Sequence, residues 1–226
     1  MKYDVTPEAI DALIGRHDFF YQRVPLPHGR EIKGKDREPM MNLVFPADFE
    51  GKSVMDIGCS LGYYLFAAEQ RGAGRCIGFE RNDSAFEHVT DIRDTLGSKV
   101  EFYKRELGDW DEPVDYMIGF NVLHHVTDPI GMLHKMVVLT KHTLLLEYVT
   151  PLNVKYARLY KVTGDMMKQP LIAVGGLCKP DGILTFAFTP AAMIKILKQH
   201  IGCKGDIQQG ISPEKDRRWL VWHRPQ

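Results

Sequence analysis

The stretch VMDIGCSLGYY, residues 54–64, decides the fold that the sequence predicts. An apolar run ends at Asp56, a turn with glycines at 58 and 62 follows, and an apolar segment with helical spacing comes directly after it. Glycine lets a backbone turn sharply and approach a ligand closely, and the amides at a helix N-terminus attract a polar group. The stretch therefore predicts a strand, a ligand-binding turn and a helix.

The same alternation of short apolar runs and amphipathic segments continues to about residue 150, which indicates βα units and a mainly parallel sheet. The expected strands cover residues 53–57, 76–80, 100–107, 114–120 and 143–149, with a closing antiparallel pair at 204–211 and 217–224. The expected helices cover residues 6–16, 61–72 and 191–201, with one more opening at Asp128-Pro129. A further helix, capped by Asn82, Asp83 or Ser84, is expected to run to about Leu96, where Gly97 stops it.

The length of 226 residues predicts one well-cored domain, 1–226. Within it we expect four segments: an N-terminal cap (1–50), a ligand-binding core (51–150), a variable substrate or lid segment (151–188), and a C-terminal helix with the closing strand pair (189–226). The Gly- and Pro-containing composition of the third segment favours a loop-rich elaboration.

The charge, the cysteine spacing and the hydropathy of the chain argue against several classes of protein. The 29 basic and 29 acidic residues give a net charge of zero, so no global field favours nucleic acid or an anionic membrane. The four cysteines lie far apart, which predicts reduced thiols and no metal site. No run of 18 apolar residues occurs, so we expect a cytoplasmic protein that does not span a membrane.

The acidic residues at the ends of two predicted strands help to decide which cofactor the turn binds. A dinucleotide-binding turn has a third glycine three residues after the second, and this chain lacks it. Asp56 would meet the phosphates of a dinucleotide, whereas it suits the cationic amino-acid end of S-adenosylmethionine. Glu80, 24 residues later at the end of the next strand, is placed to accept from both ribose hydroxyls. The pair predicts S-adenosylmethionine as cofactor.

Further site residues follow from the ends of the other strands. Glu106 and Leu107 are expected near the adenine, with Asp109 as a competing acid, and Tyr63 near the amino-acid part. His124 and His125 are candidate general bases, and Glu147 could orient an acceptor. The predicted catalytic residues are thus His124, His125 and Glu147. The predicted cofactor residues are Asp56, Gly58, Cys59, Ser60, Gly62, Tyr63, Glu80, Arg81, Glu106, Leu107, Asn121 and Val122.

Two charged stretches have alternative interpretations. The run Lys33, Lys35, Asp36 and Arg37 either clamps a carboxylate or phosphate or is a solvated loop. The stretch RRWLVWHR (217–224) combines arginines with tryptophans, as a nucleic-acid surface does, but strand alternation puts its two indoles on opposite faces. We therefore expect a buried closing strand there.

The motifs DIGCSLG (56–62), the acid at 80 and NVLHHVTDP (121–129) together resemble those of class I S-adenosylmethionine-dependent methyltransferases. The resemblance covers residues 53–150 and implies a Rossmann-like α/β fold: a seven-stranded, mostly parallel sheet with an antiparallel C-terminal strand and helices on both faces. The segment before the first strand also resembles the bacterial tRNA wobble-uridine carboxymethyltransferases, which use carboxy-S-adenosylmethionine. That branch has a tyrosine where this chain has His124, which favours plain S-adenosylmethionine.

The sequence thus predicts an enzyme that transfers a methyl group from S-adenosylmethionine to an oxygen or nitrogen atom of a small molecule. Two alternatives stay open. One is methyl or carboxymethyl transfer to wobble uridine of tRNA, which would make nucleic acid the partner. The other is a non-catalytic scaffold that retains cofactor binding.

Overall fold

The computed structural model describes residues 3–153, 157, 161–178 and 183–225. The chain divides into two compact units, Met1–Trp110 and Asp111–Gln226. Seven strands form the main sheet in the order β10-β11-β7-β6-β3-β4-β5, of which the last three belong to the first unit. Whether the chain folds as the single domain that the sequence predicts stays a prediction.

The first unit is built on three parallel strands, β3 (Ser53–Ile57), β4 (Arg75–Phe79) and β5 (Glu101–Tyr103). Helix α3 (Tyr63–Gln70) packs on β3 and β4, and α4 (Asp83–Leu96) packs against β5. Asn82 caps α4 by accepting from the amide of Ala85, and Gly97 ends the helix in a left-handed conformation. The predicted end of α4 at Gly97 is confirmed, and Asn82 is the cap among the three residues that the sequence offers.

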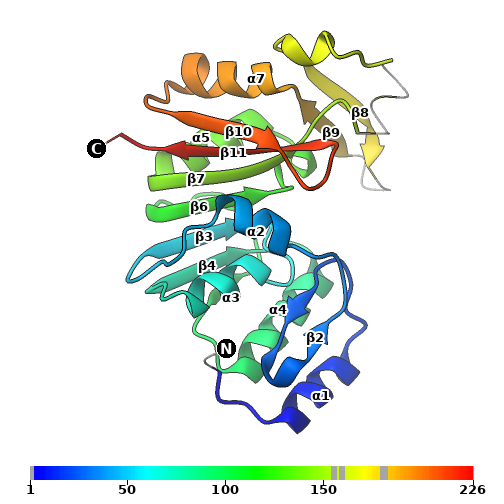
Figure 1. Ribbon diagram of the computed structural model, residues 1–226, viewed down its shortest axis with the longest axis vertical. Coiled ribbons are helices and arrows are strands. Elements are labelled where there is room, and N and C mark those ends of the chain that lie inside the picture. The colour runs from blue at the N-terminus through cyan, green and yellow to red at the C-terminus, as the bar shows by residue number, and fades with distance from the viewer. Residues whose placement is uncertain (1–2, 154–156, 158–160, 179–182, 226) are drawn as a thin grey trace. The chain divides into compact units, whose positions relative to one another are not determined.

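The N-terminal segment of this unit contains helix α1 (Pro7–Arg16), a small hairpin of β1 (Val24–Pro25) and β2 (Glu31–Ile32) around the 3-10 turn η1 (Pro27–Gly29), and helix α2 (Glu38–Val44). Helix α1 lies beside α4, as Figure 1 shows, and Arg16 holds Asp91 of α4 through two hydrogen bonds. The sequence predicts α1 but misses α2, whose seven residues are too few to show a clear helical period.

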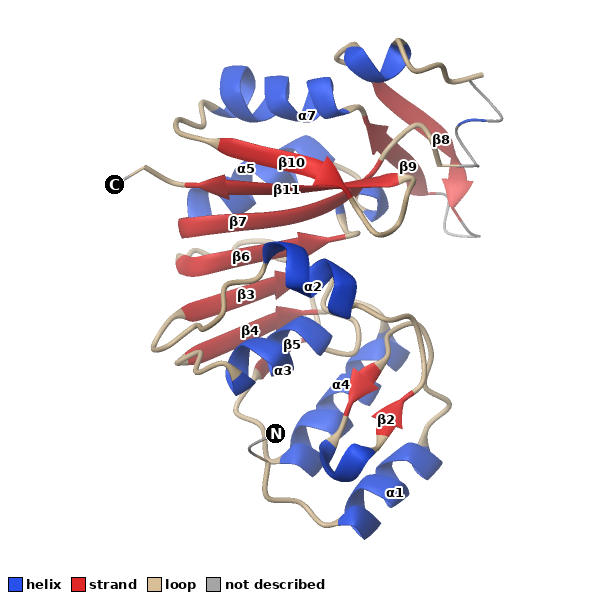
Figure 2. Cartoon of the chain, viewed as in Figure 1, coloured by secondary structure: helices blue, strands red, loops and turns tan. Residues whose placement is uncertain are grey.

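The second unit contains the other four strands of the main sheet. Strands β6 (Val114–Phe120) and β7 (Thr140–Val149) are parallel, and β11 (Arg217–His223) pairs antiparallel with both β7 and β10 (Ile207–Ile211). Helix α5 (Pro129–Leu139) packs on β6 and β7, and α7 (Pro190–Lys195) continues into a π-helical turn, η4 (Ile196–Ile201), that contacts α5 (Figure 2). The predicted buried closing strand is confirmed, since β11 lies inside the sheet.

The central strands β3 and β7 are buried along most of their length, and this explains their apolar runs. Val54 and Met55 of β3 and Leu144, Leu145 and Leu146 of β7 are all fully buried. Polar side chains in such strands therefore gather at the strand ends, where the chain leaves the sheet. Cys59, Cys76 and Cys203 are buried free thiols, as the sequence predicts for them.

Some predicted boundaries are wrong. The third strand ends at Tyr103 and not at residue 107, and the helix after the glycine turn begins at Tyr63 because Gly62 has a left-handed φ of 75°. The segment 151–188 is more ordered than its composition indicates: it contains a 3-10 turn, η3 (Met166–Lys168), and a second hairpin of β8 (Ile172–Cys178) and β9 (Ile183–Phe188). Residues 154–156, 158–160 and 179–182 of that predicted segment lie outside the described residues.

Among the described residues, none of the helices is both long enough and apolar enough to cross a membrane. The same part of the chain contains no cluster of three or more metal-ligating side chains.

The packing of β4 allows a direct test. A Cβ atom on Gly78 would lie 2.6 Å from Cδ1 of Phe102 and 2.8 Å from Cδ1 of Leu65, both buried. We expect Gly78→Ala to lower the free energy of unfolding by about 1–3 kcal/mol through overpacking. Gly15→Ala is the control, because a Cβ there meets no atom within 4 Å. Chemical denaturation should show the control equal to or more stable than the parent; equal stability of both variants would contradict this packing.

Candidate functional site

The glycine turn of the first unit is held in an unusual backbone conformation. Gly58, Ser60 and Gly62 have φ angles of 72°, 52° and 75°, so alternate residues are left-handed. Two features exclude a side chain at Gly62: its left-handed φ, and the 2.9 Å distance that a Cβ atom there would have from Cγ2 of Val89. The amides of Gly58 and Cys59 both donate to the carbonyl oxygen of Phe79, at 2.8 and 3.1 Å, which ties the turn to the end of β4.

Glu80 supports the turn through its carboxylate. Its Oε2 accepts from the amide of Ser60 at 2.9 Å, and its Oε1 accepts from the amide of Asn82 at 2.8 Å. Each carboxylate oxygen can accept two hydrogen bonds, so both oxygens keep capacity for further donors. The sequence predicts a ligand-facing role for the turn amides, whereas the Ser60 amide has Glu80 as its partner.

The amide of Leu61 donates to a residue that the sequence does not single out. Its partner is the side-chain oxygen of Gln22, at 3.1 Å in a buried position. Gln22 is 5% exposed and belongs to the N-terminal segment. This contact fixes the predicted cap directly on the glycine turn, and no motif around Gln22 could have shown it.

Asp56, at the end of β3, is an isolated buried acid. Its side chain is 2% exposed, and none of the described residues forms a hydrogen bond or an ion pair with its carboxylate. Burial, together with the negative charge of Glu80, raises the pKa of Asp56 well above its ordinary value. Burial, with the negative charges of Asp56 and Glu80, also raises the pKa of the Cys59 thiol. The surroundings of Asp56 and Glu80 therefore favour the binding of a positively charged group.

The residues predicted for the adenine lie on the surface loop after β5. Glu106 is exposed and pairs with Arg81 at 2.9 Å, while Leu107 is fully buried. Asp109, the competing acid, pairs with Arg105 at 3.0 Å. Tyr63, at the start of α3, is buried, and its ring lies 5.1 Å from that of Tyr64.

The second unit has its own polar cluster, centred on Glu147 at the carboxyl end of β7. Glu147 is 1% exposed, and its carboxylate accepts from the Asn121 side-chain amide and the Ser212 hydroxyl, with Nη1 of Arg217 at 3.6 Å. The backbone oxygen of Glu147 accepts from the amide of Asn121 at 2.9 Å. Asn121 follows β6 with a left-handed φ of 62°, and its Oδ1 is buried with no hydrogen-bond partner.

The two histidines follow in the 3-10 turn η2 (Leu123–His125). Val122 and His124 are half-buried and His125 is exposed. The two imidazole centroids lie 3.9 Å apart, whereas adjacent side chains on an extended backbone would point in opposite directions. The turn replaces the extended backbone, and Asp128 then caps α5 by accepting from the amide of Gly131.

Sequence reasoning found Asn121 and Glu147 separately but missed Ser212 and Arg217 as their partners. Ser212 lies in the turn between β10 and β11, and Arg217 begins β11. Antiparallel pairing places Trp219 opposite Glu147 and so brings the start of β11 to the same strand end. The Arg-Trp pattern could have pointed to a partner for a buried acid, but only the register of β11 identifies which one.

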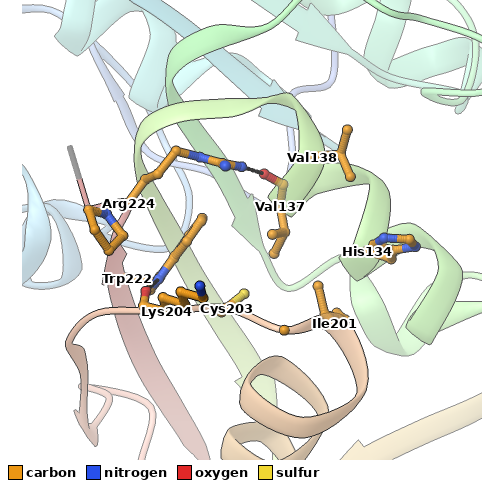
Figure 3. Close-up of a pocket in the computed structure, with 10 residues that line it drawn as sticks. His134, Val137, Val138, Ile201, Cys203, Lys204, Trp222 and Arg224 are labelled. Atoms are coloured by element: carbon orange, nitrogen blue, oxygen red, sulfur yellow. Dashed lines mark hydrogen bonds between the residues drawn. The ribbon is translucent and has the colours of Figure 1, made fainter.

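A cavity of about 450 Å³ lies at the opposite end of these strands (Figure 3). Its lining includes His134, Cys203, Lys204, Trp222 and Arg224. Arg224 is already engaged there, since it donates to the carbonyl oxygens of Thr140 and Val137 at 2.6 Å. Ligands of parallel α/β sheets bind at the carboxyl ends of the strands, so this cavity is not the candidate site.

A family model described as a methyltransferase domain matches residues 36–200, well over half of the chain. The chain belongs to this methyltransferase family. The predicted enzyme class is therefore confirmed, and the matched region contains the glycine turn together with Asn121 and Glu147, but not Ser212 and Arg217.

Solved structures confirm the predicted Rossmann-like class I fold of the methyltransferase. The N-terminal domain of EvdMO1, solved in the presence of SAH and D-fucose, matches with a TM-score of 0.71 over 98% of both chains at 12% identity. Magnesium protoporphyrin IX methyltransferase from Synechocystis PCC 6803, with bound SAH, matches with a TM-score of 0.59 over 78% of this chain and 75% of that one, at 20% identity. Identities this low show the fold alone.

Among curated proteins, the methyltransferase is 35% identical over 99 residues to the tRNA U34 carboxymethyltransferase of Campylobacter hominis. The match covers 42% of this chain and 35% of that relative. The chain aligns with about a third of the length of the curated relatives it matches.

Asp56 gives a prediction about stability. A raised pKa in the folded state means that the folded protein binds more protons than the unfolded chain, so stability falls as the pH rises above the ordinary aspartate value of 3.8. Asparagine does not ionise, so Asp56→Asn removes this pH-dependent loss of stability. We expect the variant to be more stable than the parent at pH 7 when no ligand is present. Urea unfolding at pH 4 and pH 7 measures the effect. Asp109→Asn, at a 91% exposed side chain, should leave the parent's pH profile unchanged; a profile for Asp56→Asn parallel to the parent's would contradict the buried acid.

Glu147 gives a second prediction. Glu147→Ala leaves Arg217 and Asn121 without their buried partner, and we expect the free energy of unfolding to fall by about 3–5 kcal/mol. Glu147→Gln retains hydrogen-bonding capacity and the size of the side chain, and serves as the matched control with a smaller loss. Denaturant titration of both variants compares them. Equal and small losses would show that the cluster does not stabilise this strand end.

Proposed function

We propose that the chain is an S-adenosylmethionine-dependent methyltransferase that transfers a methyl group to an oxygen or nitrogen atom of a small-molecule acceptor. The observation that carries the proposal is the pair of carboxylates, Asp56 and Glu80, at the ends of β3 and β4 beside a left-handed glycine turn. The family match supports methyl transfer as the reaction.

The charge of this corner supports a cationic ligand. A buried carboxylate that lacks a partner is unfavourable, and a bound cation relieves both the burial of Asp56 and its repulsion with Glu80. The cofactor has an ammonium group and a sulfonium centre, whereas a dinucleotide would bring phosphates to the same place. Asp56 is therefore assigned to the amino-acid end of the cofactor.

Glu80 is assigned to the ribose. Its two oxygens are oriented by the amides of Ser60 and Asn82 and keep capacity for two hydroxyl donors. Arg81 and Glu106 pair on the surface and would border the adenine, with buried Leu107 supplying apolar contact. The assignment of Gly58, Cys59, Ser60, Gly62 and Tyr63 to the turn side of the cofactor, and of Asn121 and Val122 to the cofactor, stays a prediction.

When bound, S-adenosylmethionine supplies an activated methyl group, and the chain's own residues then position the acceptor and remove its proton where needed. His124 is the better candidate base, since it is half-buried on a turn that follows β6. Glu147 already accepts from Asn121 and Ser212 and faces Arg217, so we assign it to positioning Asn121 and not to proton transfer. His125 is exposed and is the second candidate.

A sugar-like acceptor is the favoured small molecule. The N-terminal domain of EvdMO1, which matches 98% of this chain, was solved in the presence of D-fucose, and this supports a hydroxyl acceptor here by fold analogy alone. The cytoplasm is the compartment that this proposal expects.

A second candidate is carboxymethyl or methyl transfer to wobble uridine of tRNA, because the curated relatives are named tRNA U34 carboxymethyltransferases. It has two features against it. The net charge is zero, and His124 replaces the tyrosine of that branch. It predicts salt-sensitive tRNA binding and a preference for the carboxylated cofactor.

The test combines binding and transfer. Calorimetry should show S-adenosylmethionine binding at least as tightly as carboxy-S-adenosylmethionine, with Glu80→Gln weakening it roughly tenfold to a hundredfold through loss of charged hydrogen bonds. Glu87→Gln, on the exposed side of α4, is the control. Transfer of labelled methyl groups is then measured with sugars, amines and bulk tRNA.

Three outcomes decide between the candidates. Methyl transfer to a sugar or amine supports the proposal. A clear preference for carboxy-S-adenosylmethionine with transfer to tRNA would move the second candidate to first place. No binding of either cofactor by the parent chain would overturn both.

A further inference from the structure

Arg37 is a buried cation at the start of α2. Its residue surface is 4% exposed, and its Nε has no hydrogen-bond partner. Lys33, Lys35 and Asp36, which accompany it in the charged run, are all exposed. Arg37 therefore departs from the solvated-loop interpretation of the run, and the sequence alone could not separate it from its neighbours.

The neighbours of Arg37 orient the guanidinium without neutralising it. The ring of Tyr21 lies 4.7 Å from the guanidinium carbon and stacks against it. Asp36, the adjacent acid, lies 3.8 Å from Arg23 instead. Within the described part of the chain, no carboxylate forms an ion pair with Arg37. Buried arginines are normally paired, so this one lacks an anion that a ligand can supply.

The surroundings place Arg37 in the segment that rests on the glycine turn. Tyr21, which stacks on Arg37, directly precedes Gln22, whose side chain accepts from the amide of Leu61 at 3.1 Å. Burial and the charges of Glu38 and Asp36 raise the pKa of Tyr63 to about 12, so the start of α2 also lies near the first residue of α3. The hydrogen bond between Gln22 and Leu61 belongs to the turn that the proposed function assigns to the amino-acid part of the cofactor.

We propose that the Arg37 guanidinium, held by Tyr21, binds the α-carboxylate of the S-adenosyl cofactor. This inference rests on the proposed function. An amino acid is a zwitterion. Among the described residues of the first unit, Arg37 is a buried cation and Asp56 a buried anion, and the two do not pair with each other. Arg37 takes the carboxylate through its planar fork of N–H donors, and Asp56 takes the ammonium group.

The experiment uses two probes that differ only in the carboxylate: S-adenosylhomocysteine and its decarboxylated analogue. Calorimetric titration of the full chain should show that the parent binds S-adenosylhomocysteine roughly tenfold to a hundredfold more tightly. Arg37→Met should bind both probes equally, at the parent's affinity for the decarboxylated one. Arg37→Lys, which retains the charge but loses the fork, should show an intermediate preference.

Two controls separate this role from a structural one. Arg23→Met removes an arginine of the same segment that pairs with Glu31 at 2.7 Å, and it should keep the parent's preference. Thermal unfolding without ligand should show Arg37→Met no less stable than the parent, because the variant loses a buried charge without a partner. If Arg37→Met does not fold, Arg37→Lys replaces it in the test. This variant should then prefer S-adenosylhomocysteine over the decarboxylated analogue several-fold less than the parent does.

The inference is overturned if Arg37→Met keeps the parent's preference, or if it weakens both probes equally. A parent chain that binds neither probe would instead refute the proposed function, and that result appears before any variant is measured.

Discussion

Burial of the sheet on both faces is the constraint on which the other features depend. Inside such a sheet there is no water to solvate a charge, so a carboxylate in a strand is unfavourable unless a partner compensates it. Leu144, Leu145 and Leu146 follow this constraint, and Glu147, the next residue, is the exception that marks the strand end. Asp56 stands in the same position on β3.

The two buried acids satisfy this constraint differently. Glu147 has all its partners within the protein: an amide, a hydroxyl and a guanidinium. Asp56 has none among the described residues, and burial together with the negative charge of Glu80 raises its pKa. A side chain with its partners in place stabilises the fold, whereas one without them is ready for a ligand. This difference leads us to assign Glu147 to positioning and Asp56 to binding.

The sequence predicts what depends on local pattern and misses what depends on register. The glycine turn, the Asn82 cap and the ends of α4 follow from residues a few positions apart, and the structure confirms them. Gln22, Ser212 and Arg217 act through partners 39, 65 and 70 positions away, and no local pattern links them. Arg37 could be predicted only in part, because the sequence shows the charged run to which it belongs but not that its side chain is buried. The third predicted strand is too long because its pairing with β4 ends at Tyr103, and that end is set by a partner strand that the local sequence does not show.

The central claim is that the carboxylates at the ends of β3 and β4 bind an S-adenosyl cofactor. A crystal structure of the chain with S-adenosylhomocysteine tests it most directly. The account predicts both ribose hydroxyls within hydrogen-bond distance of Glu80 and the amino-acid part against the turn at residues 56–62. A ribose that contacts other residues while Glu80 keeps only the amides of Ser60 and Asn82 would contradict it.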